Sequence, residues 1–108
     1  MLTDDEQLSR IFMALSDKTR RDIMSRLLKE SLTVKKVAQP LSMSMAAVSK
    51  HLNVLRDSGL IEQVRNGKEK LCTLNIDCLF PAIIWMESFG TLNFLDWDSL
   101  ELLLSDEK

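Results

Sequence analysis

The sequence predicts a mainly α-helical single domain with one small β-hairpin. Its 108 residues are enough for one compact domain, taken here as 1–108, and too few for a second. Only 3 Gly and 2 Pro occur, which supply too few turns for a many-stranded sandwich. Apolar residues recur with helical spacing along most of the chain and follow a strand pattern only near residues 60–74.

Two amphipathic helices are expected first. A stripe at i, i+3, i+4 and i+7 predicts a helix at about 4–15, formed by Leu8, Ile11, Phe12 and Leu15. Ser16 and Asp17 are good N-caps for a second helix at about 17–30. Its inward stripe is expected to consist of Ile23, Leu27 and Leu28.

A short helix, a turn and a longer helix follow. Thr33 can cap a helix that reaches Gln39, because Pro40 cannot continue it. Ser44 is the cap of a fourth helix at about 44–58, which ends at Gly59, the natural residue for a left-handed helix stop. Its inward stripe is Val48, Leu52 and Leu55.

The pattern then changes to that of two short strands. Residues 60–65 and 69–74 are β-type runs joined around Asn66-Gly67, a strong two-residue hairpin signal. Helical spacing returns at Asp77 and predicts a last helix at about 77–104, with a kink at Gly90.

Charge is distributed unevenly along the chain. The net charge is -2, yet residues 18–70 contain twelve basic and five acidic residues, whereas 71–108 contain one basic and seven acidic. A local basic face, not the overall sum, determines contact with phosphates. A nucleic-acid partner is therefore compatible with the low overall pI.

Several classes of protein are disfavoured by what the sequence lacks. It has no apolar run long enough to span a membrane and no basic signal-peptide opening, so we expect a cytoplasmic protein. A single His and the absence of a Gly-rich phosphate loop or nucleophile elbow argue against an enzyme. Two cysteines and no CxxC pair make neither a disulfide framework nor a structural zinc site.

The short helix, turn and longer helix form a helix-turn-helix, whose second helix is sized for the DNA major groove. Small and hydrogen-bonding side chains crowd the first half of that helix and its outer face, where they can approach base edges and phosphates. The residues expected to contact DNA here are Ser44, Met45, Ala46, Ser49, Lys50 and Asn53.

The hairpin offers a second DNA contact, as the wing of a winged helix-turn-helix. Two cations flank its tip, where they can lie along the backbone or in the minor groove. The residues expected to contact DNA here are Arg65, Asn66, Gly67 and Lys68.

Three stretches resemble the ArsR-type winged-helix repressors: Phe12–Arg21, Met43–Leu55 and Ser58–Ile61. The resemblance implies a homodimer that binds a palindromic operator, with the first and last helices at the dimer interface. The interface residues expected on those helices are Leu8, Ile11, Phe12, Ile83, Met86, Phe89 and Leu92. In the family, the position that matches His51 is commonly His and lies at the DNA. The resemblance therefore implies that His51 contacts a phosphate or a base. The alternative is that His51 packs at the border of the core.

The chain departs from the family pattern at its metal sites. Family sensors place cysteines on the third helix, where this chain has Leu32 to Lys36, and acidic and His ligands on the last helix, which here has no His. A lysine pair also repels a divalent cation. We therefore expect no metal and no cofactor. The other departure is Lys18, where the family commonly has a helix-starting proline, a position that accepts most residues.

Two alternatives to a metal-independent DNA-binding repressor stay open. Cys72 and Cys78 can form a thiol-based redox switch, although a buried structural role is the commoner one for such cysteines. The winged-helix fold also serves as a protein-interaction module, and Met43 and Met45 keep that alternative open.

Overall fold

The computed structural model describes residues 4–89. It confirms the predicted fold class, a mainly helical winged helix-turn-helix. The elements in order are α1 (Asp4–Leu15), α2 (Lys18–Lys29), β1 (Leu32–Thr33), α3 (Val34–Ala38), α4 (Met45–Asp57), β2 (Ile61–Asn66), β3 (Glu69–Leu74), one turn of 3₁₀ helix, η1 (Ile76–Leu79), and α5 (Phe80–Glu87).

The three predicted N-caps are confirmed. The side chain of Asp17 accepts a hydrogen bond from the backbone amide of Arg20 at 3.0 Å. Thr33 caps α3 and Ser44 caps α4 in the same way, each accepting from an amide three residues on, at 3.2 Å and 3.1 Å. Each cap satisfies an amide that has no partner inside its helix, which fixes where the helix begins.

The left-handed stop at Gly59 is also confirmed. Gly59 has a φ of +86°. Its amide donates to the carbonyl of Arg56 at 2.9 Å, and the next amide, of Leu60, donates to the carbonyl of Leu55 at 3.0 Å. This pair of bonds is the Schellman ending of a helix, which turns the chain sharply from α4 into β2.

The sheet has three strands, one more than the predicted hairpin. Its order is β1-β3-β2 and both pairings are antiparallel, with Leu32 opposite Cys72. A strand of two residues is too short to show a period of two in the sequence, and its partner lies about forty residues further along the chain. The sequence pattern therefore gave no sign of β1.

The hairpin loop is shifted by one residue from the prediction. Asn66 pairs with Glu69 at the end of the ladder, so the loop consists of Gly67 and Lys68 rather than Asn66 and Gly67. Gly67 has a φ of +68°, and no residue other than glycine among 4–89 has a positive φ. A glycine at the first loop position is the preference of a type II′ turn, whereas an Asn-Gly loop favours type I′.

The core lies between α1, α2, α3, α4 and the start of the sheet. The predicted inward residues Val48, Leu52 and Leu55 are all at most 1% exposed. One expectation in α2 is wrong, because Leu28 is 63% exposed and Met24 is buried in its place. Residues 23, 24 and 27 share one face of a helix, and position 28 has rotated past its edge.

The last helix begins later than predicted. The 3₁₀ turn η1 precedes it, and α5 starts at Phe80, next to Pro81, which suits the first turn of a helix. Helical geometry is described only as far as Glu87. The predicted continuation to about residue 104, with the kink at Gly90, lies outside the described residues.

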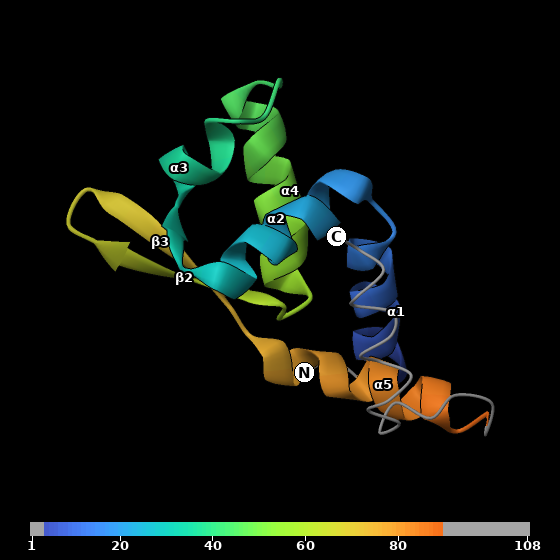
Figure 1. The fold of residues 1–108 in the computed structure, drawn as a ribbon. Coiled ribbons are helices and arrows are strands. Elements are labelled where there is room, and N and C mark those ends of the chain that lie inside the picture. Colours follow the sequence, from blue (N-terminus) through green and yellow to red (C-terminus); the bar gives the residue numbers. More distant parts are fainter. Residues whose placement is uncertain (1–3, 90–108) are drawn as a thin grey trace.

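Figure 1 shows how the elements are arranged. The hairpin of β2 and β3 projects from the body on the same side as α3 and α4, whereas α5 packs against α1 at the other end of the molecule. The helix-turn-helix and the wing are therefore neighbours, and the two helices expected to form a dimer interface lie away from them.

Candidate nucleic-acid interface

Helix α4 presents one face to the core and the other to solvent. Its core face anchors it through side chains that are fully buried, so its orientation is fixed by packing. The expected DNA-contacting residues of the outer face are exposed: Ser44, Met45, Ala46, Ser49, Lys50 and Asn53. The small side chains among them leave the helix backbone accessible.

The wing is tied to α4 by a side-chain hydrogen bond. Arg56, in the last turn of α4, donates from Nη1 to Oε1 of Gln63 in β2 at 3.2 Å. Arg65, Asn66, Gly67 and Lys68 are all exposed at the free end of the hairpin. Their position relative to α4 is thus supported by a specific contact as well as by the turn at Gly59.

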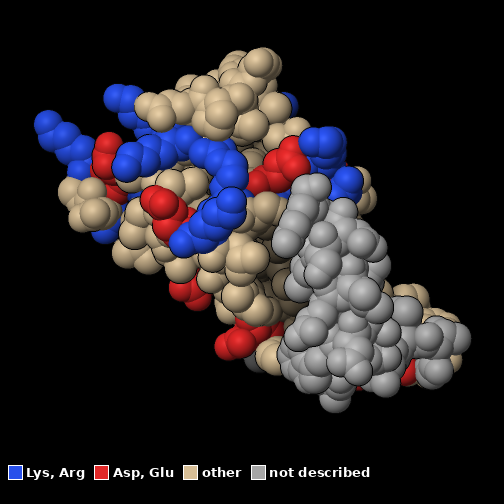
Figure 2. Space-filling model, viewed as in Figure 1, with Lys and Arg blue, Asp and Glu red and all other residues tan. Residues whose placement is uncertain are grey.

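A cleft of about 420 Å³ lies between α3, α4 and the wing. Its lining is strongly basic, with five cationic side chains and one acidic side chain, Glu69. The cations are Lys35, Arg56, Arg65, Lys68 and Lys70. Figure 2 shows Lys and Arg side chains gathered over the hairpin and the neighbouring helices. A concave basic surface of this kind concentrates the field that attracts phosphates.

The cleft brings together some of the predicted residues and adds others. Met45, Ser49, Asn53, Arg65 and Lys68 line it, while Ser44, Ala46 and Lys50 lie on the exposed part of α4 outside its lining. Sequence reasoning did not place three of its cations at the site: Lys35, Arg56 and Lys70. Lys70 pairs with Arg65 across the hairpin, so the register of the ladder is the signal that could have located it.

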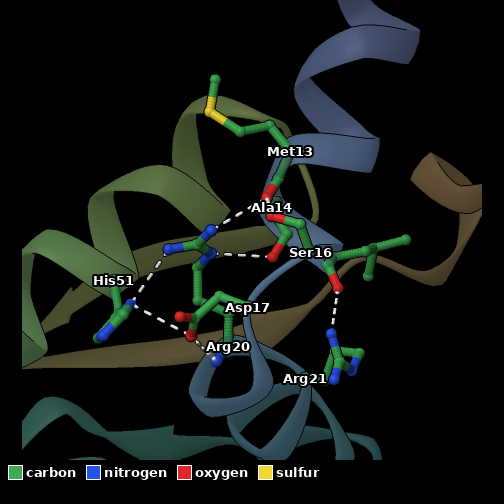
Figure 3. Close-up of polar contacts among 8 residues, drawn as sticks. Met13, Ala14, Ser16, Asp17, Arg20, Arg21 and His51 are labelled. Carbon is green, nitrogen blue, oxygen red and sulfur yellow. Dashed lines mark hydrogen bonds and ion pairs between the residues drawn. The ribbon is translucent and has the colours of Figure 1, made fainter.

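His51 lies on the other flank of α4, among residues from the start of α2. Its Nδ1 atom is 3.2 Å from Nη1 of Arg20 and 3.7 Å from Oδ2 of Asp17. Figure 3 shows the imidazole directed toward these two side chains. The backbone amide of Arg20, which donates to the carboxylate, lowers the pKa of Asp17 below its ordinary value; desolvation opposes this shift, and the positive charge of the Arg20 side chain adds to it.

Three arginines in the basic segment cap the ends of helices. Arg20 donates to the carbonyls of Ala14 at 2.8 Å and Met13 at 3.0 Å, and Arg21 donates to Leu15 at 2.7 Å, all at the C-terminal end of α1. Arg26 donates to the carbonyls of Val37 and Lys36 at the end of α3, each at 2.8 Å. These carbonyls have no partner within their own helices, so the three guanidinium groups serve the fold directly.

An apolar surface covers α1 and α5 at the other end of the protomer. Phe12 and Trp85 are edge to face with ring centroids 5.6 Å apart, and Trp85 meets Phe89 in the same way at 4.7 Å. Phe89 is 60% exposed and Trp85 is 46% exposed. Large apolar side chains this exposed are typical of an interaction surface.

The expected interface residues have different environments. Leu8, Phe12, Ile83 and Met86 are half-buried and Phe89 is exposed, whereas Leu92 lies outside the described residues. Ile11 is 0% exposed because it faces the core of its own protomer, so it is corrected here from an interface residue to a core residue. In α1 the neighbouring Met13, 60% exposed, is on the surface instead.

Comparison with known proteins agrees with this geometry. A family model for a helix-turn-helix domain matches residues 15–64. The transcriptional repressor SdpR of Bacillus subtilis is 33% identical over 82 residues, which cover 76% of this chain and 91% of SdpR. A crystal structure of an ArsR family transcriptional regulator is 33% identical with a TM-score of 0.75, covering 79% of this chain and 93% of that one. The chain belongs to the ArsR family.

The winged-helix architecture recurs in a solved structure of lower sequence identity. The solution structure of a homodimeric winged helix-turn-helix DNA-binding domain from Mycobacterium bovis is 24% identical, with a TM-score of 0.63 over 81% of this chain and 82% of that one. At this identity the likeness concerns the fold. Membership of the ArsR family makes this chain a DNA-binding transcriptional regulator and not an enzyme.

The two cysteines of this ArsR family member are at least half-buried. Cys72 is buried in β3, and Cys78 is half-buried beside Gly59. Burial raises the pKa of both thiols, which outweighs the hydrogen bonds donated to their sulfurs by Gln63 and Gln7. A raised pKa lowers the thiolate fraction, and the thiolate is the reactive form.

Within residues 4–89, no group of three or more His, Cys, Asp or Glu side chains gathers where a metal ion could bind. Over the same range, no helix has both the length and the apolar character required to cross a bilayer.

Proposed function

We propose that this ArsR family regulator is a homodimeric repressor that binds a palindromic operator without a metal effector. The observation that carries the proposal is the basic cleft between α3, α4 and the wing, beside a helix whose outer face has small and hydrogen-bonding side chains. Phosphate contacts from the cleft would supply affinity, and side chains of α4 would supply sequence selectivity.

Helix α4 is proposed to enter the major groove. Ser49, Lys50 and Asn53 can donate to or accept from base edges, and the small Ala46 allows close approach. Ser44 and Met45 at the start of the helix lie where the chain would cross the groove edge. The groove is about 12 Å wide, which admits a helix without bulky outward side chains.

The wing is proposed to contact the flanking backbone or minor groove. Arg65 and Lys68 carry the charge for this contact, while Asn66 and Gly67 keep the hairpin tip narrow. Lys35 and Lys70 also line the cleft and add to the same basic surface. Together these cations would contact phosphates of one DNA strand, beside the groove that α4 occupies.

The dimer is proposed to form through α1 and α5. The exposed rings at that end, together with Leu8, Phe12, Ile83 and Met86, provide an apolar surface that one protomer leaves in water. The relative from Mycobacterium bovis is homodimeric. A two-fold dimer would place two copies of α4 in successive major grooves, roughly 10 bp apart, and this spacing implies a palindromic operator.

A repressor role is favoured by the likeness to SdpR, which is named a transcriptional repressor. Such a protein would act at the nucleoid in the cytoplasm. Two alternatives are weaker. A protein-binding winged helix is expected to expose large apolar groups at α4, whereas the cleft beside α4 has five cationic side chains and three apolar ones, Val34, Met45 and Leu52. A thiol switch is disfavoured because burial raises the pKa of Cys72 and Cys78.

The test is footprinting on the DNA upstream of the chain's own gene, in EDTA and with added Zn²⁺. The proposal expects two protected half-sites related by a two-fold axis, with the same protection under both conditions. Protection that needs the metal would contradict a metal-free mechanism. No protection at any sequence, with binding that depends only on salt, would contradict an operator-specific repressor.

A further inference from the structure

A second polar contact region lies on the side of α4 away from the wing. In an α-helix, His51 is rotated by about 160° from Ser49, which lines the basic cleft. A helix in the major groove has a phosphate backbone on both sides. The cations of the wing and cleft can contact the phosphate backbone on one side of the groove. The region around His51 faces the phosphate backbone on the other side.

Arg20 is held in place by fixed groups. Its Nε and Nη2 atoms donate to the carbonyls of Ala14 and Met13, which lie in the last turn of α1. Two bonds from one planar guanidinium fix both its position and its plane. The remaining nitrogen, Nη1, then lies 3.2 Å from Nδ1 of His51 (Figure 3).

The chemistry of arginine determines which of the two nitrogen atoms donates in this contact. Arginine stays protonated and has no acceptor atom, so its N–H must donate and Nδ1 of His51 must accept. An accepting Nδ1 carries a lone pair, which leaves the proton of the neutral ring on Nε2. Asp17, at 3.7 Å from the same Nδ1, is beyond hydrogen-bond distance and its Oδ2 already accepts from the amide of Arg20.

The other ring nitrogen is directed away from this cluster. Figure 3 shows Nε2 on the side of the imidazole opposite Arg20 and Asp17. The side chain of His51 is 20% exposed, and within residues 4–89 both of its polar contacts are made by Nδ1. Nε2 is therefore the atom of His51 that can contact a partner.

We infer that Arg20 is a positioning residue for DNA binding: it keeps the proton of His51 on Nε2, from which His51 donates to a phosphate on the strand opposite the wing. This inference rests on the proposed function. In this role Arg20 does not contact the phosphate itself. Its guanidinium is hydrogen-bonded to carbonyls of α1 and acts on DNA binding through His51.

The first measurement does not involve DNA. His51 is the only histidine in the chain, so nitrogen-15 NMR of histidine-labelled protein at pH 8.5 gives one pair of ring signals. The wild type is expected to show the Nε2–H tautomer alone. In Arg20→Met, Asp17 becomes the polar group beside Nδ1, and a population with the proton on Nδ1 is expected.

Arg21→Met is the matched control. Arg21 also donates to a carbonyl at the end of α1, at 2.7 Å, and carries the same charge, but it does not contact His51. Its tautomer signal should stay as in the wild type. Thermal unfolding of both variants checks the fold. If Arg20→Met does not fold, Arg20→Lys replaces it, since one ammonium cannot serve the same three acceptors in one plane.

The second measurement is a double-mutant cycle on operator affinity. Arg20→Met and His51→Ala are each expected to weaken binding about tenfold, the loss typical of one charge-assisted hydrogen bond. The double variant should also lose about tenfold, because the two residues act as a unit, whereas independent residues would lose about a hundredfold. Arg21→Met should change affinity less than about threefold.

The outcomes separate this inference from the proposed function. An unchanged tautomer in Arg20→Met, or an additive double variant, would overturn the role of Arg20 even if the wild type binds its operator. A wild type that binds no operator would instead contradict the proposed function, while the NMR result still decides whether Arg20 controls the proton of His51.

Discussion

The cationic side chains of residues 18–70 have two distinct roles. Arg20, Arg21 and Arg26 donate to carbonyls at helix ends, where they complete the hydrogen bonding of the backbone. Lys35, Arg65, Lys68 and Lys70 line the open cleft instead. A count of basic residues shows that a segment can attract phosphate, and the contacts of each residue show whether it is available to do so.

Lys50 is an exposed cation of α4 that lies outside the lining of the cleft. Lys50→Ala is expected to weaken operator binding about tenfold, because a specific base or backbone contact is worth about 1–3 kcal/mol. Gel-shift titration against the operator measures the effect. Lys29→Ala is the matched control, since Lys29 is an exposed lysine outside the cleft. Equal affinities for the wild type and both variants would show that Lys50 does not contact the operator.

At the level of elements, the sequence predicted those parts whose signals are local. The caps at Asp17, Thr33 and Ser44 and the stop at Gly59 were all identified, because each depends on the chemistry of a single residue next to a helix end. The strand β1 was missed because it exists only through pairing with β3, and the cleft because it is made by three elements distant in sequence.

The turn between α4 and β2 is expected to be sensitive to substitution at Gly59. A Cβ there would lie 2.6 Å from Sγ of Cys78, in addition to the cost of its φ of +86°. Gly59→Ala should lower the free energy of unfolding by about 3 kcal/mol. Gly67→Ala, with a φ of +68° and open space around the added Cβ, should cost only about 1 kcal/mol.

Urea denaturation of both variants measures these two values. Equal losses would show that crowding against Cys78 contributes nothing and that backbone strain alone accounts for the cost of losing either glycine.

At the scale of the whole molecule, the two surfaces proposed to bind DNA and to form the dimer lie at opposite ends of the protomer. The basic cleft lies beside α4 and the wing, and the apolar surface lies on α1 and α5 (Figure 1). This separation lets a dimer form without covering the surface proposed to bind DNA. The sequence predicted both ends, but it assigned Ile11 to the interface because a helical stripe alone does not distinguish a core residue from one at an interface.

The proposed dimer predicts a specific effect of charge placed directly after α5, at Phe89. Phe89→Asp is expected to give monomers in sedimentation velocity, because an ionised carboxylate would be desolvated in an apolar interface. Phe89 is 60% exposed in the protomer, so the protomer should stay folded. Leu28→Asp, at a side chain 63% exposed on α2, is the matched control and should leave the dimer intact. A dimeric Phe89→Asp variant would place the interface elsewhere.

The central claim is that the cleft and wing bind the phosphate backbone, and the salt dependence of operator affinity tests it most directly. The slope of log affinity against log salt concentration reports the number of phosphates neutralised. The double variant Arg65→Ala/Lys68→Ala is expected to reduce the magnitude of that slope by about 2 relative to the wild type, with weaker binding to every duplex. An unchanged slope would contradict the claim, since these two cations would then make no contact with DNA.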